Sequence, residues 1–236
     1  VTTKTFNPMS EGADRGLSRA RIRRQARSSL ERLGLERIPL YMTHDWDPDV
    51  PIEETLRALD ELVREGTIGA IGCSNVSAEQ LAEAVELSEL EGIARFEWVQ
   101  NGFSLLARGD AETVFPVCHE HGLGYTPFSP LAGGWLAGRY RRGEPFPPGS
   151  RMALRPEGGA DYATDRVFDA LDHLRGEADG RGVSMAALAL AWALAVPEVT
   201  AVVVGPRTVD HLAPAAEALE VRLSSAERDA LTRLFP

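Results

Sequence analysis

The chain alternates between short runs rich in β-branched residues and longer segments whose apolar residues recur every three or four positions. Ile22, Ala26, Leu30 and Leu33 show the second pattern, which predicts a helix with one apolar face. Strands are expected at residues 1–6, 38–44, 68–74, 96–103, 123–129 and 201–205. Helices are expected at residues 18–33, 51–65, 77–87, 111–121, 163–181, 184–195, 208–218 and 225–234. Nearly every predicted strand is followed by a helix, and one long irregular segment remains at residues 132–159.

Repeated strand–helix units indicate an α/β protein with a parallel sheet, either an open sheet or a closed (β/α)8 barrel. No G-x-G-x-x-G follows the first predicted strand and no P-loop motif occurs, which weakens the open nucleotide-binding sheet. Distinctive polar residues instead end several strands, where barrels build their sites. We therefore predict a TIM-barrel type fold, formed by a single domain over residues 1–236.

Composition narrows the class of protein. Hydrophobic residues make up 44% and charged residues 25% of the chain, as in an average globular protein. There are 25 Lys and Arg against 35 Asp and Glu, and the net charge of −10 argues against nucleic acid or an anionic membrane as a partner. The longest apolar stretch, residues 185–197, is too short to span a membrane, and Cys73 and Cys118 suit a reducing compartment. We expect a cytoplasmic protein with no membrane partner.

Two titratable residues fall at the ends of predicted strands. Lys4 lies in the first strand, where its ammonium either faces solvent or, if partly buried, lowers the pKa of a neighbour or holds an anion. His44 ends the second strand, either as a core histidine bonded to backbone or as an acid–base group.

Two other sets of residues point to a nucleotide. Ser74, Asn75 and Gln100 can grip a carboxamide, although the first two can equally cap the turn that follows them. The segment 125–134 joins aromatic, hydroxyl and glycine residues after a strand, which suits a flat ring and a phosphate. A further anion site is expected at residues 205–208, with Thr208 as the N-cap of the next helix.

Metal-binding residue types also occur in the chain. Asp45, Asp47 and Asp49 alternate, but the glycine and distal glutamate of a calcium loop are absent, so we expect them to begin the loop and cap the next helix. Residues 118–121 hold a cysteine and two histidines that do not converge on one helix. We expect no bound metal, and a metal-dependent hydrolase using His44, Asp45 and Asp47 is the weakest hypothesis.

In chain order, these passages resemble the aldo-keto reductase family over essentially the whole chain. The passages that carry the resemblance are residues 3–4, 16–19, 28–33, 40–44, 59–66, 71–75, 100, 129–140 and 205–208. The resemblance implies a (β/α)8 barrel that transfers a hydride from NADPH to an aldehyde or ketone of a small molecule without a metal.

The resemblance also implies roles for individual residues. Lys4 matches the catalytic lysine that lowers the pKa of a tyrosine, and His44 matches the histidine that orients the carbonyl and assists proton donation. The implied cofactor-binding residues are Ser74, Asn75 and Gln100 for the carboxamide, Phe128 for stacking on the nicotinamide, Ser129, Leu131 and Gly134 for the pyrophosphate, Gly205 and Arg207 for the 2′-phosphate, and His211 in the adenine-binding segment. His211 and Ala215 stand where the family has Gln and Asn, which departs from its adenine contacts.

The chain also departs from the family at its beginning. The first two βα units of the family, which carry the catalytic aspartate and tyrosine, are expected to be absent, so the six predicted strands match the third to eighth. One hypothesis is that upstream residues complete an active reductase. The alternative is a shortened, catalytically impaired relative that acts as a nucleotide-binding or interaction module and associates with itself or a partner through open sheet edges. Arg139, Arg141, Arg142 and Arg151 either hold phosphate or face solvent.

Overall fold

The computed structural model describes residues 1–9 and 15–236. The chain divides into two compact units. Unit 1 comprises Val1–Asn101 and Asp110–Tyr125, and unit 2 comprises Gly102–Gly109 and Thr126–Pro236. The single domain over residues 1–236 stays a prediction.

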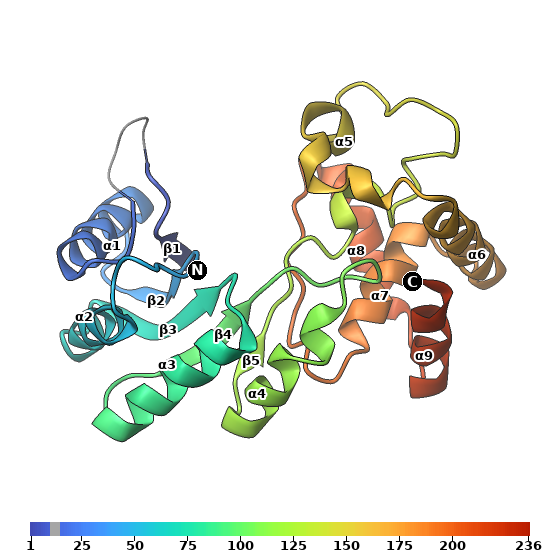
Figure 1. Ribbon diagram of the computed structural model, residues 1–236. Coiled ribbons are helices and arrows are strands. Elements are labelled where there is room, and N and C mark those ends of the chain that lie inside the picture. Colours follow the sequence, from blue (N-terminus) through green and yellow to red (C-terminus); the bar gives the residue numbers. More distant parts are fainter. Residues whose placement is uncertain (10–14) are drawn as a thin grey trace. The chain divides into compact units, whose positions relative to one another are not determined.

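Unit 1 is built on a parallel sheet of five strands paired in chain order (Figure 1). The strands are β1 (Thr2–Thr5), β2 (Ile38–Thr43), β3 (Ile68–Ser74), β4 (Phe96–Gln100) and β5 (Gly124–Tyr125). Thr5 of β1 pairs with Thr43 of β2, and Ser74 of β3 pairs with Gln100 of β4. This register brings the carboxyl ends of neighbouring strands to one edge of the sheet, where parallel sheets carry their functional groups.

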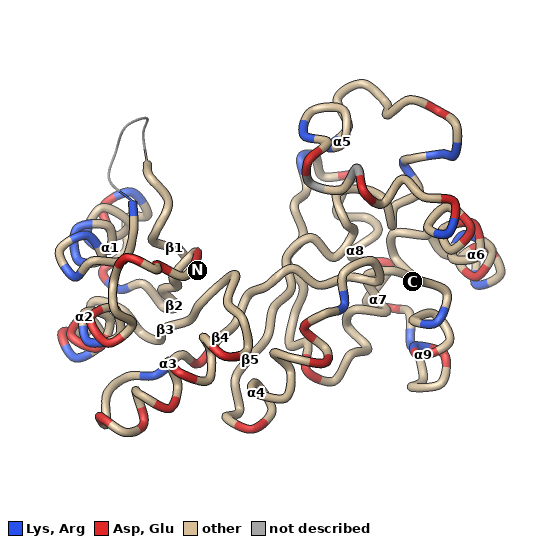
Figure 2. Tube along the Cα trace, in the orientation of Figure 1, with Lys and Arg blue, Asp and Glu red and all other residues tan. Residues whose placement is uncertain are grey.

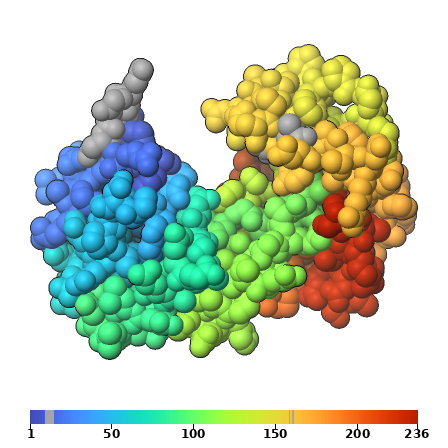
Figure 3. All heavy atoms as spheres, viewed as in Figure 1, coloured from blue at the N-terminus to red at the C-terminus, as the bar shows by residue number. Residues whose placement is uncertain are grey.

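The connections between these strands form the helical layer of unit 1. It consists of α1 (Arg19–Leu33), α2 (Ile52–Arg64), α3 (Ala78–Glu91) and α4 (Val114–His121), with a short 3-10 helix η1 (Gly109–Ala111) before α4. Helices that follow one another in the chain contact each other, and Figure 3 shows α1, α2 and α3 in turn on the face of unit 1 in view. Leu56 and Leu59 of α2 are fully buried while Glu54 is exposed, as the apolar spacing of this helix predicts.

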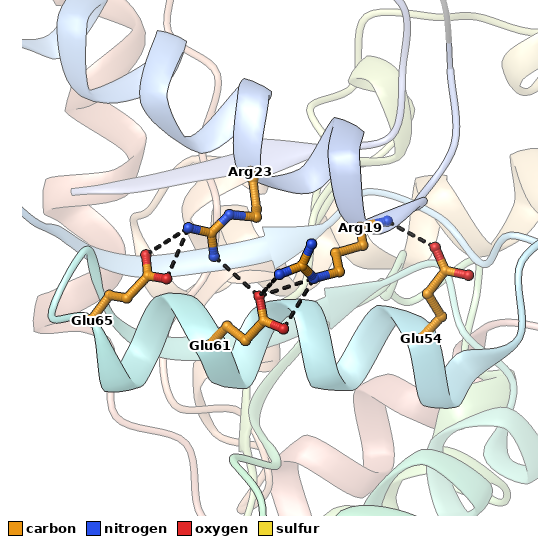
Figure 4. Close-up of polar contacts among 5 residues, drawn as sticks. All are labelled: Arg19, Arg23, Glu54, Glu61 and Glu65. Atoms are coloured by element: carbon orange, nitrogen blue, oxygen red, sulfur yellow. Dashed lines mark hydrogen bonds and ion pairs between the residues drawn. The ribbon is translucent and has the colours of Figure 1, made fainter.

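Charged side chains join α1 to α2. Basic residues gather on α1, acidic residues on α3, and α2 carries both signs (Figure 2). Arg19 Nε donates to both carboxylate oxygens of Glu61 at 3.0 and 3.1 Å, and Arg23 reaches Glu61 at 3.1 Å and Glu65 at 2.8 Å (Figure 4). The backbone N–H of Arg19 donates to Glu54 Oε1 at 2.9 Å. Because these pairs are exposed, each adds little by itself, and their value lies in linking the two helices as a network.

Ser77 and Gln80 form a capping box at the start of α3. Gln80 N donates to Ser77 Oγ at 3.3 Å, and Ser77 N donates to Gln80 Oε1 at 2.9 Å. Each bond satisfies a backbone donor that the first turn of a helix leaves without an intrahelical partner.

The prediction that the aspartates cap α2 is wrong. The N-cap of α2 is Pro51, and no side chain caps it. Asp47 is buried instead and accepts from Leu17 N at 2.6 Å and Asp49 N at 3.0 Å. Its carboxylate therefore ties the start of the α1 region to the β2–α2 loop.

Unit 2 is helical in its described residues. The α-helices are α5 (Arg151–Leu154), α6 (Asp165–Arg181), α7 (Met185–Leu194), α8 (Ala213–Glu220) and α9 (Ser225–Leu234), and the 3-10 helices are η2 (Ala132–Gly134), η3 (Pro156–Gly158), η4 (Ala160–Tyr162) and η5 (Val209–Leu212). α7 is almost wholly buried, and its Ala187, Leu190 and Ala191 pack against Ala218 of α8. In the part of the chain that the structure describes, no helix has both the length and the apolarity to cross a membrane.

The strand predicted at residues 201–205 is wrong. Val202 and Val204 pack on the α7–α8 cluster, whereas Val203 is 38% exposed. Its backbone bonds to the neighbouring segment through Val203 N and Pro127 O at 2.9 Å. A strand needs a repeating ladder of such bonds, and Pro127 and Pro206 have no N–H to extend one.

Several other predicted elements are shorter or begin later, and the helix expected at residues 111–121 begins at Val114. The fourth strand ends at Gln100 instead of residue 103, and the fifth spans Gly124–Tyr125 instead of residues 123–129 because Pro127 lies inside that range. The helix expected at residues 208–218 begins as a 3-10 helix before Pro214 and continues as α8. Together with the missing sixth strand, this leaves the parallel α/β sheet established and the closed barrel unconfirmed.

The cap of α9 predicts how stability depends on pH. Ser224 Oγ and its backbone N–H bond the Glu227 carboxylate at 2.7 and 2.9 Å, which together with Arg181 lowers the pKa of Glu227 to about 2. Because the folded pKa is depressed, this stabilisation is complete above the unfolded pKa of about 4.3 and is lost as pH falls toward 2. We expect Glu227→Gln to lower the free energy of unfolding at pH 7 and to flatten its fall below pH 4.5, measured by urea unfolding. An unchanged acid limb would contradict this.

Candidate functional site

Lys4 is the centre of a polar cluster at the carboxyl edge of the unit 1 sheet. Its Nζ donates to Gln100 Oε1 at 2.5 Å and to Ser74 Oγ at 3.3 Å. Ser74 is fully buried, and its hydroxyl donates onward to the Gln100 carbonyl at 2.5 Å. Burial lowers the pKa of the Lys4 ammonium, since its partners are neutral and do not repay the loss of water. Of the two alternatives for the Lys4 ammonium, exposure to solvent or partial burial, the structure shows partial burial.

His44 lies one residue beyond β2 at the same edge. Its backbone N–H donates to Thr5 O at 2.7 Å, and its ring Nδ1 contacts Asn7 Nδ2 at 3.1 Å. Burial lowers the pKa of His44, the charge of Lys4 lowers it further, and Asp45 opposes both. Burial and the charge of Lys4 therefore favour the neutral imidazole, and the side chain is half-buried.

Asn75 follows β3 in a strained conformation. Its φ of 56° is left-handed, a region that asparagine tolerates better than most residues. The side-chain Nδ2 donates to the His44 carbonyl at 2.8 Å and to Ser74 Oγ at 3.3 Å. In the described residues these bonds leave Oδ1 of Asn75 and Nε2 of Gln100 without a protein partner, and such an acceptor and donor fit the two ends of a carboxamide.

Unit 2 contains a cavity of about 1200 Å³. Its lining includes all the predicted nucleotide-binding residues of this unit, namely Phe128, Ser129, Leu131, Gly134, Gly205, Arg207 and His211. The ring of Phe128 lies so close to Gly102 that a Cβ there would come within 3.1 Å of it. Sequence reasoning therefore selected residues that the fold brings together.

The turn from Ser129 to Gly134 is shaped for close approach by a ligand. Ser129 has a φ of 55°, Ala132 of 47°, Gly133 of 64° and Gly134 of 108°, all left-handed. Two backbone donors close the turn itself: Ala132 N donates to Ser129 O at 2.8 Å and Gly134 N donates to Leu131 O at 2.9 Å. A Cβ on Gly134 would lie 3.1 Å from Arg139 Cδ, so this backbone and a cationic side chain are adjacent.

Four arginines line the same cavity: Arg139, Arg151, Arg155 and Arg207. Arg142 instead bonds Asp165 and Asp169, and Arg141 is exposed. Arg207 belongs to a short turn in which its backbone N–H donates to His211 Nδ1 at 3.2 Å. Cationic side chains around this turn are of the kind that binds phosphate groups, and Phe128 offers a flat apolar surface.

The family model described as "Aldo/keto reductase family" matches residues 1–235. The chain belongs to the aldo-keto reductase family. The match covers the whole span and lends no support to the expectation that two βα units of the family are missing.

Several curated relatives of this aldo-keto reductase are about one-third identical to it. The uncharacterized oxidoreductase YrpG of Bacillus subtilis is 34% identical over 100% of the chain and 72% of its own length. An aldo-keto reductase of Fusarium vanettenii is 32% identical over 93% of the chain and 58% of its own length. A probable voltage-gated potassium channel subunit beta of Arabidopsis thaliana is 33% identical over 94% of the chain and 68% of its own length. The first two of these relatives support a generic oxidoreductase.

The tyrosines in unit 1 of this aldo-keto reductase are poor proton donors. Tyr41 is fully buried, its hydroxyl donates to Ile22 O at 3.5 Å, and burial raises its pKa to about 12. Tyr125 donates to Asp110 Oδ2 at 2.7 Å, and burial followed by the nearby carboxylate raises its pKa. Both hydroxyls are thus committed to the protein interior.

The metal-binding residue types do not come together. Groups of three or more histidine, cysteine or carboxylate side chains around one point are absent from residues 1–9 and 15–236. Asp47 is occupied by backbone donors, and His121 lies in the last turn of α4 with Nδ1 3.3 Å from Glu89 Oε1.

Three residues at these sites were not selected from the sequence. Asn7 contacts the ring of His44, Arg21 lies buried behind β1, and Arg155 lines the unit 2 cavity. Arg155 follows Arg151 by four positions, and this spacing of two arginines could have been noticed in the sequence. Asn7 stands just three residues after Lys4 but carries no motif, and Arg21 is one arginine among many on α1.

Proposed function

We propose that this protein is an NADPH-dependent reductase of a small-molecule aldehyde or ketone. The observation that carries the proposal is the cluster in which Lys4 is held by Gln100 and Ser74 beside a neutral His44. Bound NADPH supplies the hydride. Lys4 places a positive charge that lowers the pKa of a hydroxyl donor, and His44 donates a hydrogen bond to the carbonyl oxygen.

Each unit carries proposed cofactor-binding residues of its own. In unit 1, Asn75 and Gln100 recognise the carboxamide through their remaining acceptor and donor. In unit 2, Phe128 gives a stacking surface and the left-handed turn and arginines of the cavity bind the phosphates. Arg207 distinguishes NADPH from NADH because a 2′-phosphate is recognised through charge-assisted bonds.

The direct test is a fluorescence titration of the purified protein with NADPH, followed by addition of an aldehyde. Saturable binding and aldehyde-dependent loss of NADPH support the proposal. No binding at millimolar NADPH would refute it.

Arg207→Ala is expected to raise the Kd for NADPH roughly tenfold to a hundredfold, since one charge-assisted bond is worth about 1.5–3 kcal/mol. The Kd for NADH should stay within about twofold, because it lacks the 2′-phosphate that Arg207 binds. Arg141→Ala is the matched control, an exposed arginine of the same unit outside the cavity. Equal losses for both nucleotides would mean that Arg207 only maintains the turn.

The competing proposal is an impaired relative that binds nucleotide without turnover. The buried tyrosines of unit 1 favour it, and relatives named as channel subunits show that not every matching protein is named as an enzyme. NADPH binding without oxidation would select it. We propose that an active protein draws its proton donor from a tyrosine outside unit 1. The intact mass of the preparation shows whether the protein is larger than 25.6 kDa.

The closure of the barrel, the location of the protein and its partners are also proposals. We propose that the parallel sheet is completed to a (β/α)8 barrel. We also propose a cytoplasmic location and the absence of nucleic-acid and membrane partners, which agree with the acidic composition. Self-association through open sheet edges belongs to the impaired alternative, and sedimentation of the purified chain tests it.

A further inference from the structure

The ring of His44 is held by a residue that the proposed reaction does not use. Asn7 Nδ2 lies 3.1 Å from His44 Nδ1. An amide nitrogen has hydrogens to donate and no lone pair to accept with, so this contact is a hydrogen bond only when Nδ1 carries no proton. In a neutral imidazole the proton then sits on Nε2.

Asn7 is itself fixed from behind by a buried side chain. The Arg21 guanidinium is 2% exposed and donates to the Asn7 carbonyl at 2.8 Å, to the Gly16 carbonyl at 2.9 Å and to Thr5 Oγ1 at 3.0 Å. Thr5 in turn accepts the backbone N–H of His44 at 2.7 Å. One buried cation thus anchors both the backbone that carries Asn7 and Thr5 of β1, to which the backbone N–H of His44 bonds.

We propose that Asn7 is a positioning residue that fixes His44 as the Nε2–H tautomer. The other nitrogen of the ring is then a donor, which is the role that an acceptor carbonyl oxygen requires. Two charged groups act on this ring: Lys4 of β1, which opposes protonation, and Asp45, which favours it. The burial of His44 and the charge of Lys4 favour the neutral ring. Asn7 therefore determines the tautomer of the ring and not its charge.

The tautomer can be read without any nucleotide. In 15N-labelled protein at pH 7.5, imidazole nitrogen shifts distinguish a protonated Nε2 from a protonated Nδ1, and His44→Gln identifies the His44 signals. We expect Nε2–H in the wild type, with a scalar coupling across the Asn7 Nδ2–H to Nδ1 bond. A wild-type ring with its proton on Nδ1 would mean that the Asn7 amide is reversed and would overturn the proposal.

Variants of the exposed Asn7 side chain provide the second arm. Asn7→Asp places an acceptor at Nδ1 and should move the proton to Nδ1 and raise the pKa of His44, while Asn7→Ala should give mixed tautomers. The signals of His121, which lies beside Glu89, are the internal control and should not change. Unchanged His44 signals in both variants would overturn the proposal. If a variant fails to fold, the wild-type coupling decides.

The consequence for catalysis rests on the proposed reductase activity. There, Asn7→Ala should lower kcat/KM roughly tenfold at pH 7.5, about the value of one hydrogen bond, and Asn7→Asp should shift the acid limb of the pH profile upward. The expected tautomer without NADPH oxidation would refute the proposed function alone. Oxidation with the wrong tautomer would refute the role of Asn7 alone.

Discussion

Replacing Lys4 by methionine is expected to lower the turnover of aldehyde reduction roughly a hundredfold to ten-thousandfold, the usual range for losing a group that assists proton transfer. Lys4 gives the cluster its positive charge, and Gln100 and Ser74 hold that charge in place. Methionine keeps much of the length and removes the charge. The measurement is single-turnover oxidation of NADPH at saturating aldehyde, which separates chemistry from binding.

The same substitution should leave the fold intact. Because burial lowers the pKa of Lys4, its charged form opposes folding at every pH below its unfolded pKa near 10.4, and folding gains stability only as pH rises toward that value. Lys4→Met therefore removes an unfavourable term, and its thermal midpoint should not fall. Lys4→Arg is the companion variant, since it keeps a charge that does not titrate. Wild-type turnover in Lys4→Met would exclude this lysine from the chemistry.

Arg21→Ala is expected to destabilise unit 1 by about 3 kcal/mol or more, because it leaves buried acceptors without a donor. The guanidinium is 2% exposed and bonds two backbone carbonyls and the hydroxyl of Thr5. Urea unfolding followed by tryptophan fluorescence measures the loss, with Trp46 and Trp98 as reporters in unit 1.

A neighbouring arginine supplies the matched control. Arg23 lies on the same helix and pairs with Glu61 and Glu65, but its side chain and theirs are partly exposed (Figure 4). Surface pairs of this kind contribute little, so Arg23→Ala should cost much less than Arg21→Ala and should lose its effect at high salt. Equal losses in the two variants would show that Arg21 contributes no more than a surface charge.

Sequence patterns predicted the repeated elements because those elements depend on local periodicity. The apolar stripe of α2 and the capping box of α3 are specified by residues within one or two turns of each other. The strand expected at residues 201–205 failed for the opposite reason, since a strand exists only with a hydrogen-bonding neighbour and its neighbour contains Pro127.

The candidate site shows the same difference between features set by general rules of the fold and features set by contacts between distant residues. Lys4, His44, Ser74 and Gln100 were found because parallel strands bring their carboxyl ends together, a rule that needs no contact information. Asn7 was missed because its role depends on where the chain after β1 turns, and Asp47 was misassigned because its buried partner Leu17 is 30 positions away.

The Lys4 cluster has a practical consequence for observing the site. Lys4 is the single lysine of the printed sequence, and the other 24 of its 25 basic Lys and Arg positions are arginines, which stay protonated. Reductive methylation with 13C-formaldehyde would therefore place a carbon label on one side-chain amine, besides the amine at the start of the chain. Its resonance would follow the charge of the cluster directly as pH, nucleotide and aldehyde are varied.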